Sequence, residues 1–191
     1  MKNLNQFFQA FKENIALKKK AKRTVIKQHD VTDCGATCLA SISIHYGLDL
    51  PIARIRQYAG TDKKGTNVLG LIEASARLGF SAKGVKASFD NLFTIPTPVI
   101  AHVNHNNLAH YIVIYKVTED YVEVMDPAYG EMQRLTPDEF RQKWTGVLIM
   151  LLPGDDFTAG TERISLEKRF LYLLMPHKSI LIQVLIGAIF Y

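Results

Sequence analysis

Cysteine is scarce in this chain, with only Cys34 and Cys38 among 191 residues. Two cysteines in a chain of this length do not form the disulfide framework of a small secreted protein. The N-terminus also lacks a secretory signal, because its first apolar stretch is short, is broken by Lys12 and Glu13, and has no small-residue cleavage site. We therefore expect free thiols and a reducing compartment for the folded part of the chain.

The body of the chain also lacks an excess of positive charge. The formal net charge is +5, but residues 1–27 hold eight Lys or Arg against one Glu, whereas residues 28–153 hold eleven against thirteen acidic residues. A nucleic-acid-binding protein needs a basic stripe with interleaved aromatic residues on its folded part. Such a stripe is missing here, so no nucleic-acid partner is expected.

No complete nucleotide or metal motif is present. The stretch GTDKKGT at 60–66 approaches a phosphate-binding loop but lacks the lysine before the hydroxyl residue, so it predicts a glycine-rich turn into a helix. The histidines His102, His105 and His110 match no zinc spacing. We expect no metal and no cofactor in this segment, with any ATP site beyond residue 191.

Hydrophobic periodicity divides the middle of the chain into a helical half and a strand half. Helical spacing predicts helices at 33–47, 51–59 and 67–78, the last capped by Thr66 or Asn67 and stopped by Gly79. Runs of β-branched and aromatic residues then predict strands at 98–103, 110–117, 121–125 and 146–152, and a capping box at 136–139 predicts a short helix. Helices followed by an antiparallel sheet predict an α+β fold.

Composition predicts four segments along the chain. Residues 1–23 form a basic N-terminal arm, 24–153 form the folded domain, and 154–178 comprise a polar linker and an amphipathic segment. Residues 179–191 carry no charge and follow a basic flank. This run is shorter than the roughly 20 residues that cross a bilayer. We nevertheless expect the start of a first, truncated transmembrane helix from Ser179 rather than a core helix.

Cys34 is the first apolar residue after Asp33, which is a good N-cap residue. The sequence therefore predicts Cys34 at a helix N-terminus, where unpaired N–H groups and the helix dipole stabilise a thiolate. Cys38 lies one turn further along, where this effect fades and burial is expected. Two small core residues are the simpler interpretation of these cysteines, unless other groups point to a nucleophile.

Three polar residues supply that further indication. His110 opens one predicted strand, and Asp126 closes the next, so two adjacent antiparallel strands would bring them together. Asp126 could then hold the ring of His110, which takes the proton from Cys34. Gln28 lies six residues before Cys34, where its amide can fold back beside the thiol and donate a hydrogen bond to an oxyanion.

These motifs resemble those of a known family. The stretch QHDVTDCGATCL at 28–39 resembles the cysteine motif of the bacteriocin-processing peptidases, which form the N-terminal domain of peptidase-containing ABC transporters. HYIV at 110–113, followed by VMDP at 124–127, resembles the histidine motif of this family. Residues 60–80 are also similar to the family. The resemblance covers roughly residues 24–153, and the apolar tail resembles the beginning of a first transmembrane helix.

The resemblance implies a papain-like fold and cleavage of exported precursor peptides after a Gly-Gly pair that ends the leader. It assigns Cys34 as nucleophile, His110 as base and then acid, Asp126 as its orienting group and Gln28 as oxyanion donor. It also implies a homodimeric exporter in the cell membrane, with the peptidase on the cytoplasmic side and with transmembrane and ATPase domains in the same protein. Members of this family are understood to recognise an amphipathic leader helix in a shallow apolar groove.

The candidate residues for that groove are Leu69, Ile72 and Ala76, on the helix predicted at 67–78, although the same residues could simply fill the core. Two other functions remain open at this point. A catalytically silent docking domain would recruit cargo without cleaving it, and a transglutaminase-like acyl transferase would use the same Cys-His-Asp chemistry.

Overall fold

The computed structural model describes residues 24–105, 108–162, 170 and 172–190. The basic arm 1–23 and much of the predicted amphipathic segment therefore lie outside the described residues. The chain divides into two units, residues 1–161 and 162–191. All of the predicted catalytic residues belong to the first unit.

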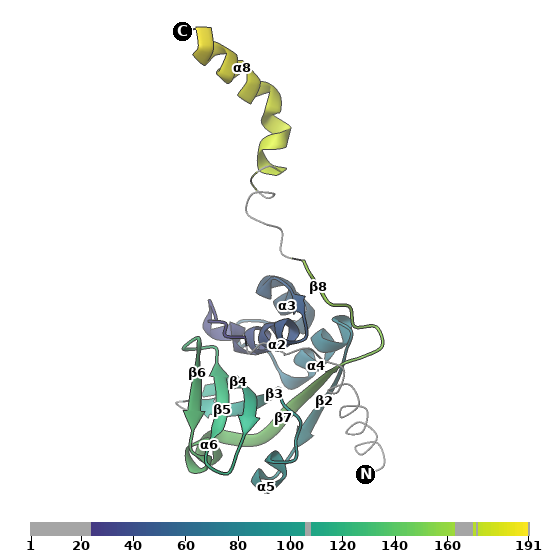
Figure 1. Ribbon diagram of the computed structural model, residues 1–191, viewed down its shortest axis with the longest axis vertical. Helices are drawn as coiled ribbons and strands as arrows, with labels where there is room; N and C mark the ends of the chain where they lie inside the picture. Colours follow the sequence, from purple (N-terminus) through teal and green to yellow (C-terminus); the bar gives the residue numbers. More distant parts are fainter. Residues whose placement is uncertain (1–23, 106–107, 163–169, 171, 191) are drawn as a thin grey trace. The chain divides into compact units, whose positions relative to one another are not determined.

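An antiparallel sheet of six strands, in the order β2-β7-β3-β4-β5-β6, is the framework of the first unit (Figure 1). Its strands are β2 (Phe80–Lys86), β3 (Val99–His105), β4 (Leu108–Val117), β5 (Val122–Asp126), β6 (Glu131–Leu135) and β7 (Trp144–Pro153). The four predicted strands correspond to β3, β4, β5 and β7. These four are the inner strands of the sheet, and their buried residues are mostly apolar, so that the sequence pattern detects them.

The strands β2 and β6 were not predicted, and both lie at the edges of the sheet. Each is largely polar, with Ser81 and Lys83 exposed in β2 and Glu131 and Arg134 exposed in β6. An edge strand has one unpaired side and carries charged residues that prevent edge-to-edge association. Such a strand lacks the hydrophobic run by which an inner strand is recognised.

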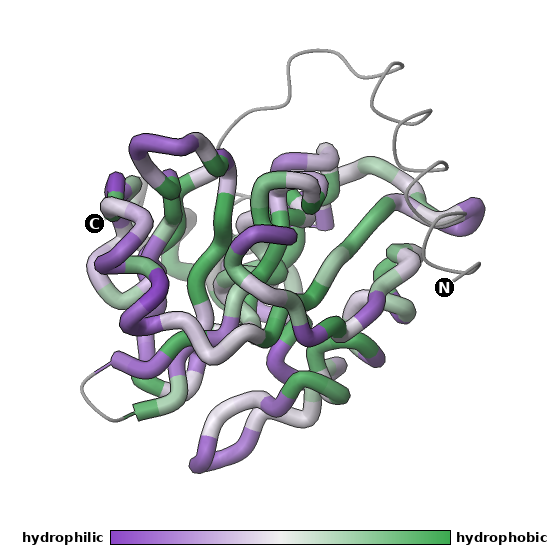
Figure 2. The backbone as a smooth tube through the Cα atoms, turned by 90° about the horizontal axis from the view of Figure 1, so that it is seen from below, coloured by the Kyte–Doolittle hydropathy of each residue, from purple (hydrophilic) through white to green (hydrophobic). Residues whose placement is uncertain are grey.

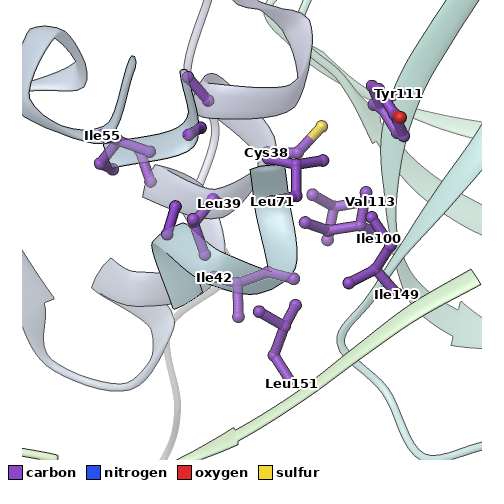
Figure 3. Close-up of a cluster of buried hydrophobic side chains, with 14 of the residues drawn as sticks. Cys38, Leu39, Ile42, Ile55, Leu71, Ile100, Tyr111, Val113, Ile149 and Leu151 are labelled. Atoms are coloured by element: carbon purple, nitrogen blue, oxygen red, sulfur yellow. The ribbon is translucent and has the colours of Figure 1, made fainter. Parts of the chain in front are cut away.

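The helices α2 (Cys34–His45) and α4 (Val68–Arg77) pack on one face of this sheet, and α3 (Ile52–Ala59) packs on these two helices. Their buried side chains form one core with the facing strands, and Figure 3 shows Cys38 and Ile42 of α2 on the side toward Ile100 and Val113 of the sheet. A second core lies against the opposite face, where α5 (Phe89–Leu92) and α6 (Pro137–Lys143) contribute Leu92 and Phe140. In Figure 2 the green hydrophobic segments run through the centre of this unit.

The helix α2 is buried along almost its whole length, from Cys34 to Ser43. Small residues make this possible because they let neighbouring elements approach closely. A Cβ added at Gly35 would lie 3.2 Å from Leu71 Cδ1 and 3.3 Å from Thr66 Cβ. The first turn of α2 is therefore held directly against the loop that leads into α4.

The N-terminus of α2 differs from the prediction in one respect. A 3₁₀ turn, η1 (Val31–Asp33), precedes the helix, and Asp30 caps that turn by accepting from the N–H of Thr32. Asp33 makes no side-chain cap to α2. Its carboxylate accepts from the N–H of Asp30 and pairs with Arg56 of α3. The prediction of Asp33 as the cap was wrong, because the capping box had formed one turn earlier.

The segment 154–161 was predicted to begin a polar linker, but it packs on the first unit. The ring centroids of Phe157 and Phe80 lie 4.6 Å apart. The N–H of Gly160 donates to the carbonyl of Gly47 at 3.0 Å, and β8 (Gly160–Thr161) pairs in parallel with β1 (Leu48–Asp49). The chain therefore leaves this unit after Thr161 rather than after Pro153. The reason is that Phe157, an aromatic residue in an otherwise polar stretch, packs on Phe80 of the core.

The second unit contains the 3₁₀ turn η2 (Met175–His177) and the helix α8 (Lys178–Phe190). The uncharged run from Ser179 is thus helical over its described length. None of the helices in the described part of the chain is long and apolar enough to cross a bilayer. The assignment of this run to a transmembrane helix stays a prediction.

Candidate active site

Cys34 is the first residue of α2, and its thiol lies at the wall of a groove of about 620 Å³. The residue is only 6% exposed. The groove is bounded by η1 and Cys34 on one side, by the loop 63–68 that leads into α4, and by the ends of β3 and β4. The buried start of a helix therefore presents a thiol to a cavity large enough for a short extended peptide.

His110 and Asp126 lie next to each other, as expected from neighbouring antiparallel strands. Val113 of β4 is paired with Met125 of β5, which places the end of β5 beside the beginning of β4. The distance from His110 Nε2 to Asp126 Oδ1 is 2.8 Å, and both residues are buried. The strand pairing therefore brings these two side chains together across sixteen residues of sequence.

The surroundings of His110 favour its protonated form. Burial alone would lower the pKa of the ring, but hydrogen bonds with Asp126 and with Cys34, together with the charges of both groups, outweigh it and raise the pKa to about 9. Asp126 occupies Nε2 of the ring, which leaves Nδ1 as the nitrogen available to the thiol of Cys34. A ring that a carboxylate holds through one nitrogen, with a thiol close enough to affect its pKa, matches a base held by an orienting acid.

Asp126 is held as a carboxylate. Burial would raise its pKa, but the hydrogen bond from the His110 ring and that from the N–H of Ala128, at 2.9 Å, lower it. Both bonds reach the same oxygen, Oδ1. The turn after β5 therefore fixes the carboxylate from one side while the histidine contacts it from the other.

Gln28 lies on the segment that enters α2 and is attached to the turn after Asp126. Its N–H donates to the carbonyl of Pro127 at 2.9 Å. The two segments approach so closely that a Cβ added at Gly130, whose φ is +69°, would lie 2.5 Å from Lys27 Cβ. The side-chain oxygen Oε1 of Gln28 is buried without a hydrogen-bond partner among the described residues. Gln28 is thus fixed through its backbone beside the strand end that carries Asp126.

Two contacts of the site were not predicted from the sequence. Tyr111, which follows His110, lines the groove together with Cys34. The ring of His105 lies 5.9 Å from that of His110, and its Nε2 is 3.4 Å from the hydroxyl of Tyr129. Strand alternation could have placed Tyr111 on the face toward the helices, whereas His105 is the last residue of β3 and no sequence pattern marks its position.

The residues predicted to bind a leader all lie on α4. Leu69 is 63% exposed and Ala76 is also exposed, so neither fills the core. Ile72 is half-buried and packs over β2 at Gly84. The core face of the same helix is formed by Leu71, Ala74 and Ser75.

A comparison with protein families identifies the family of this chain. The model of the peptidase C39 family matches residues 22–156. This chain belongs to the peptidase C39 family. Its C39 domain contains the sheet, the three helices and all four predicted catalytic residues, so the chain is a cysteine peptidase, as its resemblance implied.

Curated relatives of the C39 domain support this assignment. The lactococcin-G-processing and transport ATP-binding protein LagD of Lactococcus lactis subsp. lactis is 36% identical over 165 residues, which are 85% of this chain and 23% of LagD. The pediocin PA-1 transport/processing ATP-binding protein PedD of Pediococcus acidilactici is 38% identical over 66% of this chain and 18% of PedD. The chain therefore spans less than a quarter of the length of these relatives.

Solved structures show the same fold. The peptidase domain of Streptococcus ComA, a bi-functional ABC transporter, matches with a TM-score of 0.65 at 35% identity, over 69% of this chain and 99% of that one. A double glycine motif protease from an AMS/PCAT transporter, in complex with its leader peptide, matches with a TM-score of 0.64 at 30% identity, over 72% and 96%. The predicted α+β, papain-like fold of the C39 domain is confirmed.

Proposed function

We propose that this chain is the peptidase part of an ABC exporter and cleaves the leader of a precursor peptide after a Gly-Gly pair, so that cleavage is coupled to export of the mature peptide. The observation that carries the proposal is the His110–Asp126 pair, which is hydrogen-bonded at 2.8 Å and influenced by Cys34, together with the position of Cys34 at the wall of a groove. Relatives named for processing and transport of bacteriocins support it, as does the related protease structure with a bound leader peptide.

The chemistry follows from these three side chains. Cys34 Sγ attacks the carbonyl carbon of the second glycine, and its proton resides on Nδ1 of His110. His110 then donates that proton to the leaving amine, and an acyl-enzyme forms as the peptide bond breaks. Water, deprotonated by the now neutral His110, hydrolyses the thioester and releases the leader. Asp126 keeps the ring oriented and stabilises its positive charge throughout.

Gln28 is the proposed donor to the oxyanion of the tetrahedral intermediate. The backbone bond to Pro127 and the close packing of Lys27 on Gly130 hold the backbone of Gln28 beside the strand end that carries Asp126. Gln28→Ala is expected to lower kcat by roughly 10²–10³, the usual effect of removing one such donor, with little change in KM. Steady-state kinetics with a synthetic precursor would measure this. A change in KM alone would assign Gln28 to substrate binding instead.

The pKa of His110 sets an upper pH limit for activity. The ring is protonated below a pKa of about 9, and only the protonated ring can supply the proton to the leaving amine. We expect kcat/KM to fall about tenfold per pH unit above about pH 9. In Asp126→Asn the fall in kcat/KM should begin at a lower pH, because the hydrogen bond with Asp126 is the strongest influence that raises the pKa of His110. Measurements from pH 6 to 10.5 test this, and a fall that begins at the same pH in Asp126→Asn contradicts it.

Cleavage after Gly-Gly is tested with a synthetic precursor that has an amphipathic leader, a Gly-Gly pair and ten or so residues beyond it. We expect mass spectrometry to find a single cut after the second glycine. A narrow site rejects side chains sterically, so replacing the glycine at the cut by alanine should lower kcat/KM at least about tenfold, and by valine far more. Efficient cleavage of the valine peptide would exclude a Gly-Gly site.

The surface of α4 formed by Leu69, Ile72 and Ala76 is the proposed docking surface for the leader. A Gly-Gly site offers little apolar area, so affinity has to come from elsewhere in the substrate. Exposed Leu69 and Ala76 and half-buried Ile72 provide apolar surface on one helix beside the sheet, which suits an amphipathic leader helix. The same assay with an N-terminally trimmed leader measures this contribution, and equal cleavage of the junction peptide alone would exclude it.

The remaining partners are proposed from the relatives. ATP-binding transporters are several times longer than this chain, so the transmembrane and ATPase domains, and any bound ATP, belong to other parts of such a protein. The helical run from Ser179 would begin the membrane part. This places the C39 domain at the cell membrane on its cytoplasmic side, within a homodimeric exporter.

A further inference from the structure

His102 lies on the wall of the groove that also contains Cys34. It is on β3 directly opposite Tyr111 of β4, and the two rings are 5.1 Å apart in an edge-to-face arrangement. Because side chains alternate along a strand, His102 shares a face with Ile100, which belongs to the core beneath the helices. The histidine is thus the point on β3 where the apolar core ends and the groove begins.

The hydrogen bonds around His102 determine which ring nitrogen carries the proton. The hydroxyl of Thr145, on β7, has one hydrogen, and it donates this to the backbone carbonyl of His102 at 2.9 Å. The same hydroxyl oxygen is 2.9 Å from Nδ1 of the ring. Since the hydroxyl hydrogen is already used, Nδ1 must be the donor in this second bond. The neutral ring therefore has its proton on Nδ1 and a lone pair on Nε2.

The other ring nitrogen is available to a ligand. Burial lowers the pKa of His102, and the positive charge of His110 lowers it further, so the ring is neutral at physiological pH. Its Nε2 has no hydrogen-bond partner among the described residues, and it is not among the polar atoms that are sealed from solvent without a partner. A half-buried histidine thus presents an unused hydrogen-bond acceptor in the groove that also contains Cys34.

We propose that Nε2 of His102 accepts a hydrogen bond from a backbone N–H of the precursor peptide in the groove. This inference rests on the proposed Gly-Gly cleavage. Glycine has no side chain, so backbone N–H and C=O groups are the only polar groups by which the pair can be held. A peptide placed for attack by Cys34 passes Tyr111 and His102, because all three line the same groove. Thr145 is a positioning residue in this scheme, since it fixes the tautomer.

The decisive test couples a protein variant to a change in the substrate. His102→Phe keeps an aromatic ring beside Tyr111 but removes the acceptor, and it is expected to raise KM about tenfold with little change in kcat. In the substrate, one amide at a time near the junction, except the scissile one, is replaced by an ester, which removes the N–H. At one position the ester should lower the kcat/KM of the wild-type chain about tenfold and leave the kcat/KM of His102→Phe almost unchanged.

Matched variants control for folding and for loss of packing. His102→Gln retains an acceptor oxygen and should recover part of the lost kcat/KM and of the ester effect. Thr145→Ser keeps the hydroxyl and should resemble the wild type, whereas Thr145→Val should show a partial loss. Thermal melting and the rate of Cys34 alkylation by iodoacetamide verify that each variant is folded.

The outcomes separate this inference from the proposed function. Cleavage of the all-amide peptide by the wild-type chain tests the function itself. If that peptide is cut but every ester has the same effect in the wild type, in His102→Phe and in His102→Gln, then His102 accepts no substrate hydrogen bond and the inference is wrong. An ester effect confined to chains with an acceptor at position 102 establishes the contact.

Discussion

Cys34→Ala is expected to abolish cleavage of the precursor, with kcat reduced about 10⁵–10⁶-fold, while Cys38→Ala retains most of the activity. The proposed nucleophile opens α2 at the wall of the groove, and without it no acyl-enzyme can form. Cys38 is completely buried. Burial, together with the nearby Cys34 and Asp126, raises its pKa well above the usual range, so its thiol stays protonated.

Cys38→Ala serves as the matched control for this prediction. It removes one sulfur atom from the core shown in Figure 3 and should lower the free energy of unfolding by about 1 kcal/mol without reaching the groove. Single-turnover cleavage assays and thermal melting of both variants measure the two effects separately. Equal loss of activity from both substitutions, in protein that is shown to be folded, would overturn the choice of Cys34.

His110→Ala is expected to be almost as severe as loss of the nucleophile, whereas Asp126→Asn should lower kcat about 10³–10⁴-fold and leave measurable activity. The reason is that His110 carries the proton in both steps, while Asp126 acts only through it. The 2.8 Å bond between them orients the ring and helps to keep it protonated. An asparagine keeps the shape but loses the negative charge.

The rate of Cys34 alkylation distinguishes this ordering from simple unfolding. It should fall strongly in His110→Ala and only partly in Asp126→Asn, because a protonated imidazole beside a thiol favours the thiolate. Arg134→Gln is a suitable control, since it alters the exposed partner of buried Glu123 elsewhere on β5 and β6. An Asp126→Asn variant as inactive as His110→Ala would mean that the carboxylate has a larger part than orientation.

Most of the local structure could be predicted because it depends on nearby residues. The cap at Asn67, which accepts from the N–H of Gly70, begins α4 as expected. The capping box of Thr136 and Glu139 likewise begins α6. The C-terminal end of α4 was also predictable, since Gly79, two residues after the helix, has a φ of +81°. Each of these features is decided within one helical turn of sequence.

The meeting of His110 and Asp126 could be anticipated for a related reason. They lie on consecutive strands joined by a short connection, and antiparallel pairing of such neighbours is the usual arrangement. The resemblance to the bacteriocin-processing peptidases pointed to the same residues. The roles of Cys34, His110, Asp126 and Gln28 stay predictions until the variants described above are measured.

The sequence by itself determined the class of fold, the order of its inner elements and the family. These depend on hydrophobic periodicity, helix caps and short motifs, and each of those features is formed by residues close together in the chain. Only the tertiary structure decided which distant groups meet. In the folded chain Asp33 pairs with Arg56 of α3 instead of capping α2, and Phe157 packs on Phe80. The fold also joins His102 to Thr145, forty-three residues away, across β3 and β7. Such contacts depend on strand order and register, which are set by the packing of the whole sheet rather than by any local pattern.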